Sequence, residues 1–135
     1  MNLQSKNDIR VRYAETDQMG IVYHSNYLIW FEVGRTELFR KLKLPYTLFE
    51  DQGLGLAVIE ANCRYRTPAR YDDELKIHTR IEKLTSRKVI FHYQIFREDY
   101  LLAEGTTVHL FMNKEGRAVD AKKFPIWDEI KLLIS

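Results

Sequence analysis

The stretch SNYLIWFEVGRTELFRKL, residues 25–42, predicts the one long helix of the chain. Charged residues are interspersed in it, and its apolar positions recur at helical spacing: Tyr27, Phe31, Leu38 and Leu42. Gly34 lies midway along this helix, where the missing side chain would let the backbone approach a neighbouring backbone closely. Pro45 ends the helix, and residues 46–51 predict one or two further helical turns.

Strand patterns lie on both sides of this helix. Residues 8–13 alternate between apolar and polar positions, which predicts a half-buried strand. Four later runs predict most of the remaining structure: residues 56–67, 74–84, 88–97 and 101–112. Short polar segments at 98–100 and 113–116 predict hairpin turns, and residues 127–134 predict a last amphipathic turn or two. We therefore expect an α+β fold in which an antiparallel sheet wraps around one long central helix.

The first of the four later runs predicts where the helix packs. One face of residues 56–67 carries several small side chains: Ala57, Ile59, Ala61, Cys63 and Tyr65. Small residues let a helix lie close against a sheet, and Gly34 on the helix suits the same close approach. Cys63 is then a buried hydrophobic residue and not a nucleophile.

Composition excludes several classes of protein. The chain has 135 residues, 45% of them hydrophobic and 30% charged, which fits one globular domain spanning residues 1–135. A net charge of +2 argues against a broad nucleic-acid surface. The single cysteine, Cys63, rules out an internal disulfide framework and a CxxC metal site. We find neither a signal-peptide core nor an apolar run long enough for a membrane span, so the cytoplasm is the expected compartment.

The densest cluster of polar and aromatic residues precedes the helix, in the segment YAETDQMGIVYHSNY, residues 13–27. Acids, a histidine and a helix start lie together there, and loops of this kind often carry catalytic groups. The same residues allow a purely structural interpretation, in which Ser25 or Asn26 caps the helix, Gly20 makes a turn and Asp17 is a solvated acid. Spacing alone leaves both interpretations open.

This segment resembles a known signature. Its pattern Y-x-E-T-D-x-x-G-x-V-Y-H-x-N-Y, followed by Phe31-Glu32 and Arg35-Thr36-Glu37, is similar to that of the hotdog-fold acyl-CoA thioesterases. The nearest branch is the 4-hydroxybenzoyl-CoA thioesterase-like one, of the Tol-Pal-associated type. The stretch PARYDDEL, residues 68–75, is similar to the second landmark of that family. The resemblance implies a hotdog fold and hydrolysis of an acyl-CoA, without a metal or other cofactor.

The resemblance also implies the catalytic groups. The family's catalytic aspartate falls on Asp17, as general base for water or as direct nucleophile. Backbone N–H groups at the helix start, near His24, would polarise the thioester carbonyl. The His24 imidazole would help position water or the thioester, or else makes only a local hydrogen bond. Tyr23 is a candidate substrate-binding residue with a structural role as the alternative. A thiolate leaves readily, so a carboxylate and an oxyanion donor suffice chemically.

Two further binding sites are implied. Glu32 would contact the acyl group; the alternatives are a helix-surface acid, or a carboxylate that replaces Asp17 in catalysis. Arg87 and Lys88, after a predicted turn, would bind the phosphates of coenzyme A, or are simply solvated. Three histidines lie within predicted strands but lack the carboxylate or cysteine pattern of a metal site: His78, His92 and His109.

A homodimer or homotetramer is expected, because one helix covers a single face of one sheet and leaves strand edges exposed. The family places each active site between two protomers. One other function stays open, a non-hydrolytic acyl-thioester-binding protein. A hydratase or dehydratase that acts on acyl thioesters would need a histidine with a catalytic acid in a different local motif, which we do not find in the sequence. The sequence does not define the acyl chain, or whether its carrier is coenzyme A or an acyl carrier protein.

Overall fold

The computed structural model describes residues 3–134. One sheet holds five strands: β1 (Gln4–Arg10), β2 (Gly55–Tyr65), β3 (Glu74–Leu84), β4 (Lys88–Arg97) and β5 (Tyr100–Met112). The helices are α1 (Ser25–Lys41), α2 (Tyr46–Asp51) and α3 (Trp127–Ile130), with short 3-10 turns η1 (Tyr13–Glu15), η2 (Ala121–Lys123) and η3 (Lys131–Leu133). None of the helices within residues 3–134 is long and apolar enough to cross a membrane.

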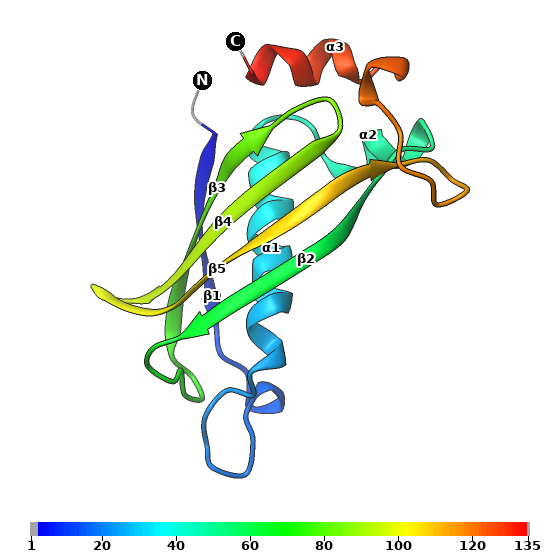
Figure 1. Cartoon of the computed structure of the whole chain (residues 1–135). Helices are drawn as coiled ribbons and strands as arrows, with labels where there is room; N and C mark the ends of the chain where they lie inside the picture. Colours follow the sequence, from blue (N-terminus) through cyan, green and yellow to red (C-terminus); the bar gives the residue numbers. More distant parts are fainter. Residues whose placement is uncertain (1–2, 135) are drawn as a thin grey trace.

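The sheet has the strand order β1-β3-β4-β5-β2, and every neighbouring pair is antiparallel. The helix α1 runs along one face of it, as Figure 1 shows. Hairpins connect β3 to β4 and β4 to β5, whereas β1 and β2 form the two edges. The predicted α+β class and the central helix are confirmed.

The core fills the space between α1 and the sheet. One face of α1 is buried at helical spacing: Tyr27, Trp30, Phe31, Gly34, Leu38 and Phe39. The rings of Phe31 and Tyr93 stack at this interface, with 4.3 Å between centroids and 4° between planes. Alternate residues of β3 and β4 face the helix, and alternation of this kind is what the sequence patterns predicted.

Gly34 makes the predicted close approach, but to a different strand. A Cβ atom on Gly34 would lie 2.2 Å from Thr79 Oγ1 and 2.9 Å from Ile77 Cγ2, both on β3. The small side chains on β2 are therefore not what Gly34 packs against. A bulge between Val58 and Glu60 breaks the alternation of β2, and 52% of Ile59 is exposed.

The remaining differences lie at element ends. The first strand was predicted over residues 8–13, yet β1 begins at Gln4 and the chain turns into η1 at Tyr13. Residues 4–7 are mostly polar, so the pairing of Gln4 with Arg80 on β3 leaves no apolar alternation to detect. The turn at 113–116 exists but leads only to an isolated bridge between Met112 and Ala118, not to another strand.

Candidate active site

A buried carboxylate holds the polar loop against the start of α1. Glu15 is only 5% exposed, and its side chain accepts hydrogen bonds from the Arg12 backbone N–H at 2.7 Å and from Trp30 Nε1 at 3.0 Å. The Glu15 carbonyl accepts two more, from the Tyr23 N–H at 2.9 Å and from Asn26 Nδ2 at 3.0 Å. Buried carboxylates need such partners, and here the partners come from both the loop and the helix. Glu15 therefore fixes the position of the loop relative to α1.

Asp17 lies at the turn of this loop, with one carboxylate oxygen anchored. Its Oδ1 accepts hydrogen bonds from the Met19 N–H at 2.8 Å and the Ile21 N–H at 3.4 Å. Its own N–H donates to the Ile21 carbonyl at 2.8 Å, and Gly20 follows with φ +80°, which closes the turn. Within residues 3–134, Asp17 Oδ2 makes no hydrogen bond. One oxygen thus orients the carboxylate and the other is free to react.

The start of α1 presents backbone N–H groups beside this carboxylate. His24 is the N-cap residue, and no side chain of the described chain caps this end of the helix. Neither Ser25 nor Asn26 is the cap that the structural interpretation required, because Asn26 bonds back to the loop. The Asn26 and Tyr27 N–H groups donate to the Tyr23 and His24 carbonyls, whereas those of His24 and Ser25 have no acceptor within residues 3–134. These two N–H groups and the positive end of the helix dipole favour a negatively charged oxygen at this point.

The end of β2 contacts the helix start through Tyr65. Its hydroxyl donates to the His24 carbonyl at 3.1 Å, and its ring lies edge-on to the imidazole with 6.4 Å between centroids. Burial, followed by the nearby Cys63, raises the pKa of Tyr65 to about 12, so this phenol remains a donor at neutral pH. Tyr23 also packs against His24, with 4.3 Å between the ring centroids.

A cavity of about 360 Å³ brings the predicted catalytic residues together. It is lined by Asp17, Ile21, Val22, Tyr23, His24, Tyr27, Tyr65, Arg66, Thr67 and Pro68. Sequence reasoning did not assign to this wall Tyr65, at the end of β2, or Thr67, just after it; Pro68 was noted only as the start of the second landmark. The second landmark, residues 68–75, was the signal that could have pointed to this wall, because it begins at Pro68, which lines the cavity. Arg66, in the same wall, pairs with Glu104 at 2.5 Å.

Hydrogen bonds hold the two landmark segments together. The Val22 N–H donates to the Ala69 carbonyl at 2.9 Å, and the Ala69 N–H donates to the Tyr27 hydroxyl at 3.2 Å. Arg97 pairs with Asp73 at 2.8 Å and steadies the turn that follows. The cavity is thus formed by segments that lie more than 40 residues apart in the sequence but share a hydrogen-bond network.

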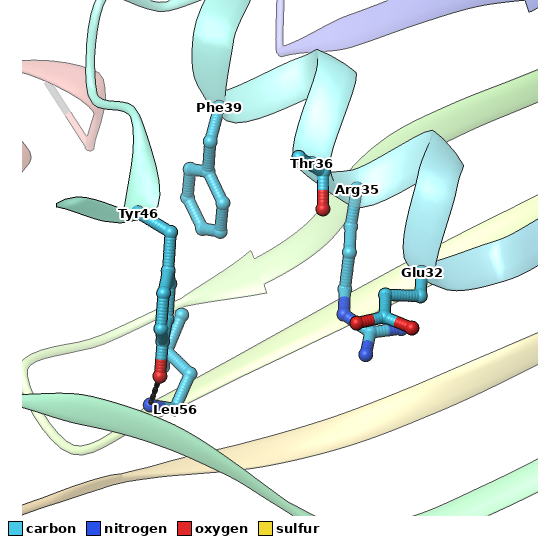
Figure 2. Close-up of a pocket in the computed structure, with 6 residues that line it drawn as sticks. All are labelled: Glu32, Arg35, Thr36, Phe39, Tyr46 and Leu56. Atoms are coloured by element: carbon cyan, nitrogen blue, oxygen red, sulfur yellow. Dashed lines mark hydrogen bonds between the residues drawn. The ribbon is translucent and has the colours of Figure 1, made fainter. Parts of the chain in front are cut away.

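Glu32 does not line this cavity. It lies in a second one of about 250 Å³, together with Arg35, Thr36, Phe39, Tyr46 and Leu56 (Figure 2). Eight residues of helix separate Glu32 from His24, a rise of about 12 Å along the axis. Within one chain, the structure does not bring Glu32 and Asp17 together.

The predicted phosphate contacts lie farther away. Arg87 and Lys88 follow the β3–β4 turn, at the end of the fold opposite the loop that carries Asp17 (Figure 1). Arg87 pairs with Asp120 at 3.7 Å, and the Lys88 N–H donates to Thr85 Oγ1 at 3.1 Å. In one chain these two residues are remote from the cavity.

The structure supports neither a metal centre nor a reactive thiol. No group of three or more His, Cys, Asp or Glu within residues 3–134 is arranged to hold a metal ion. Cys63 is half-buried, and burial raises the pKa of its thiol, which keeps it protonated and weakly nucleophilic.

An antiparallel five-stranded sheet packed along one long helix is the architecture of hotdog-fold proteins. The chain belongs to the thioesterase-like superfamily, whose family model matches residues 11–132. The protein YneP of Bacillus subtilis is 41% identical over 126 residues, 91% of each chain. The acyl-CoA thioesterase YbgC of Haemophilus influenzae is 34% identical over 99 residues, 73% of each chain.

A solved structure agrees with these relatives. The DHNA-CoA thioesterase from Staphylococcus aureus superposes with a TM-score of 0.90 and 32% identity, over 97% of this chain and 90% of that one. The predicted family and the predicted hotdog fold are confirmed, and the predicted enzyme class, a thioester hydrolase, is the class of these relatives. The Tol-Pal-associated type stays a prediction.

Proposed function

We propose that the chain is an acyl-CoA thioesterase, which hydrolyses an acyl-CoA to the free acid and coenzyme A. The observation that carries this proposal is the cavity in which the Asp17 carboxylate lies beside the uncapped start of α1. Acyl transfer needs a base or nucleophile and a donor for the oxyanion, and this cavity offers both. The named activity of the Haemophilus influenzae relative supports the same reaction.

In the first of two routes, Asp17 acts as general base. Its free Oδ2 takes a proton from water as the water oxygen attacks the thioester carbonyl carbon. The backbone N–H groups of His24 and Ser25 stabilise the negative charge that develops on the carbonyl oxygen. The tetrahedral intermediate then collapses, the C–S bond breaks, and the thiolate of coenzyme A leaves and takes up a proton.

In the second route, Asp17 is the nucleophile. Its carboxylate attacks the carbonyl carbon, the thiolate leaves, and the resulting mixed anhydride is hydrolysed by water. The anchoring of Oδ1 by Met19 and Ile21 serves either route, because it holds the other oxygen in one orientation. We further propose that the His24 imidazole positions water or the thioester and that Tyr23 contacts the substrate.

The activity is tested by a panel of acyl-CoA substrates with short linear, branched and aromatic acyl groups. We expect release of free thiol from at least one member, measured with a chromogenic thiol reagent. Each substrate without protein is the background control, and acyl carrier protein loaded with the preferred acyl group tests the carrier. Thiol release from no member of the panel would contradict the proposal.

We also propose that the protein is a homodimer or homotetramer, with each active site completed by a second copy. The edge strand β2 exposes Val58 and Ile59, 49% and 52% respectively. On the neighbouring α1, further apolar residues are exposed: Leu28, Ile29 and Val33. An exposed edge strand of 11 residues pairs readily with another chain. A second copy is also required if Glu32 binds the acyl group and Arg87 and Lys88 bind coenzyme A.

Replacing Ile59 by Lys is expected to shift this protein toward the monomer. The substitution puts a charge on the exposed edge, where it would have to be buried against a second copy. Sedimentation velocity at several concentrations gives the mass, and thiol release gives the activity. Tyr100→Lys, at the exposed β4–β5 turn, is the matched control and should not change the mass. An active wild-type monomer would overturn the proposed assembly.

A further inference from the structure

The second cavity contains an arginine without a counter-ion. Arg35 is half-buried on α1, and its guanidinium donates to the Tyr93 hydroxyl at 3.5 Å. It makes no ion pair with any carboxylate of residues 3–134. Glu32, one turn earlier, is exposed and equally unpaired within that range. Figure 2 shows both side chains extending from α1 toward the strands of the sheet.

The residues behind Arg35 supply no negative charge. The Tyr93 hydroxyl lies 2.5 Å from Thr107 Oγ1, which lies 2.8 Å from His109 Nε2. All three side chains are buried, and His109 Nδ1 has no hydrogen-bond partner among the described residues. Burial, together with the charge of Arg35, lowers the pKa of His109 to about 4, so the ring is neutral at pH 7. A guanidinium beside a neutral network attracts an anion from solvent.

The cavity walls suit a small organic anion. The Tyr46 hydroxyl accepts a hydrogen bond from the Leu56 N–H at 3.2 Å, which leaves its own proton available to an acceptor. Phe39 and Leu56 form apolar walls, and the volume of about 250 Å³ admits a chain of several carbons. The planar guanidinium matches a carboxylate in two parallel hydrogen bonds. We propose that this cavity binds a carboxylate, held by Arg35 and assisted by Tyr46.

Replacement of Glu32 distinguishes a carboxylate site from a site for a cation or a neutral hydroxyl. Its charge at the same cavity opposes an incoming carboxylate, although exposure to water weakens this repulsion relative to the attraction by the half-buried Arg35. Removal of the Glu32 charge should therefore tighten carboxylate binding. If the cavity instead bound a cation or a neutral hydroxyl through Glu32, removal of this charge would weaken binding of that ligand.

Binding is measured directly by NMR titration of the full chain with succinate. Succinamide, of the same shape but uncharged, is the matched ligand control. We expect succinate, and not succinamide, to shift the Arg35 side-chain Nε–H signal. Arg35→Gln should weaken succinate binding about tenfold or more, as expected for the loss of a charge-assisted hydrogen bond. Glu32→Gln should tighten it, and Arg40→Gln, on the same helix but paired with Glu37, should leave it unchanged.

A second variant keeps the test decisive if Arg35→Gln disturbs the fold. Tyr46→Phe keeps the ring and removes the hydroxyl, and should weaken succinate binding severalfold with an unchanged backbone spectrum. Succinate that shifts no signal of Arg35, or an affinity that neither Arg35→Gln nor Tyr46→Phe lowers, would overturn the proposal. Weaker binding in Glu32→Gln would overturn it as well.

The carboxylate has two sources: a free organic acid, or the far end of a dicarboxylic acyl-CoA. The second source rests on the proposed function. If it applies, Arg35→Gln lowers kcat/KM for succinyl-CoA about tenfold and leaves butyryl-CoA unchanged. If the free acid is the ligand, Arg35→Gln changes kcat/KM for succinyl-CoA no more than for butyryl-CoA, and succinate binding is still weakened. Should no acyl-CoA be hydrolysed at all, the proposed function fails, whereas the titration still decides whether the carboxylate site exists.

Discussion

The Asp17→Asn variant is expected to lose acyl-CoA turnover by roughly 10²–10⁴-fold, the usual contribution of a positioned general base or nucleophile. The amide has nearly the shape of the carboxylate, so its oxygen can still accept the Met19 N–H bond that orients the side chain. It can neither take a proton from water nor attack the thioester. The loss should therefore fall on kcat, measured by thiol release under saturating substrate, with the fold unchanged.

The matched control is Asp51→Asn, at the exposed end of α2, which should keep wild-type turnover. Binding of a non-hydrolysable acyl-CoA analogue to Asp17→Asn, measured by calorimetry, distinguishes the two functions. Lost turnover with retained binding favours the enzyme over a non-hydrolytic binding protein. An unchanged kcat would remove Asp17 from the mechanism.

Gly34→Ala should destabilise the fold by about 2–3 kcal/mol, although the same change in an exposed helix interior stabilises by about 1 kcal/mol. The added Cβ would lie 2.2 Å from Thr79 Oγ1, closer than any two such atoms can come. The helix must then move away from β3 and loosen the buried face of α1. Chemical denaturation of both proteins, with the midpoint and slope compared, gives the free energy of unfolding.

A double variant identifies the clash as the cause. Thr79 Oγ1 is buried without a hydrogen-bond partner among the described residues, so Thr79→Ala removes the obstructing atom without breaking a bond. Gly34→Ala should cost clearly less in the Thr79→Ala background, by about 1 kcal/mol or more. Equal costs in both backgrounds would show that Thr79 does not limit the approach of the helix.

Sequence reasoning predicted best the bounds of strands that have a neighbouring strand on each edge. The strands β3 and β4 match their predicted bounds, because buried residues alternate along most of each strand. The bounds and burial pattern of the edge strands β1 and β2 were harder to predict. The bulge after Val58 depends on the register of β2 against β5, which local alternation does not contain. The polar start of β1 carried no periodic signal.

The candidate site was predictable where it is contiguous in sequence. Asp17, Tyr23 and His24 belong to one loop, and all three line the same cavity in the structure. Tyr65 enters the same wall from the end of β2, and no spacing rule links it to a loop some 40 residues earlier. Glu32 was predicted to contact the acyl group, yet two helical turns carry it to a separate cavity within one chain, and the sequence does not show how a second copy would be placed.

The pairing of β1 with β3 has a consequence for how the protein folds. Gln4 pairs with Arg80, whereas β3, β4 and β5 are joined in series by short turns. Hairpins close small loops and form early, and contacts distant in sequence form late because their loop-closure entropy is larger. We therefore expect the three-stranded meander to be the folding nucleus and β1 to dock afterwards. The Asp17 loop, between β1 and α1, would then acquire its final shape near the end of folding.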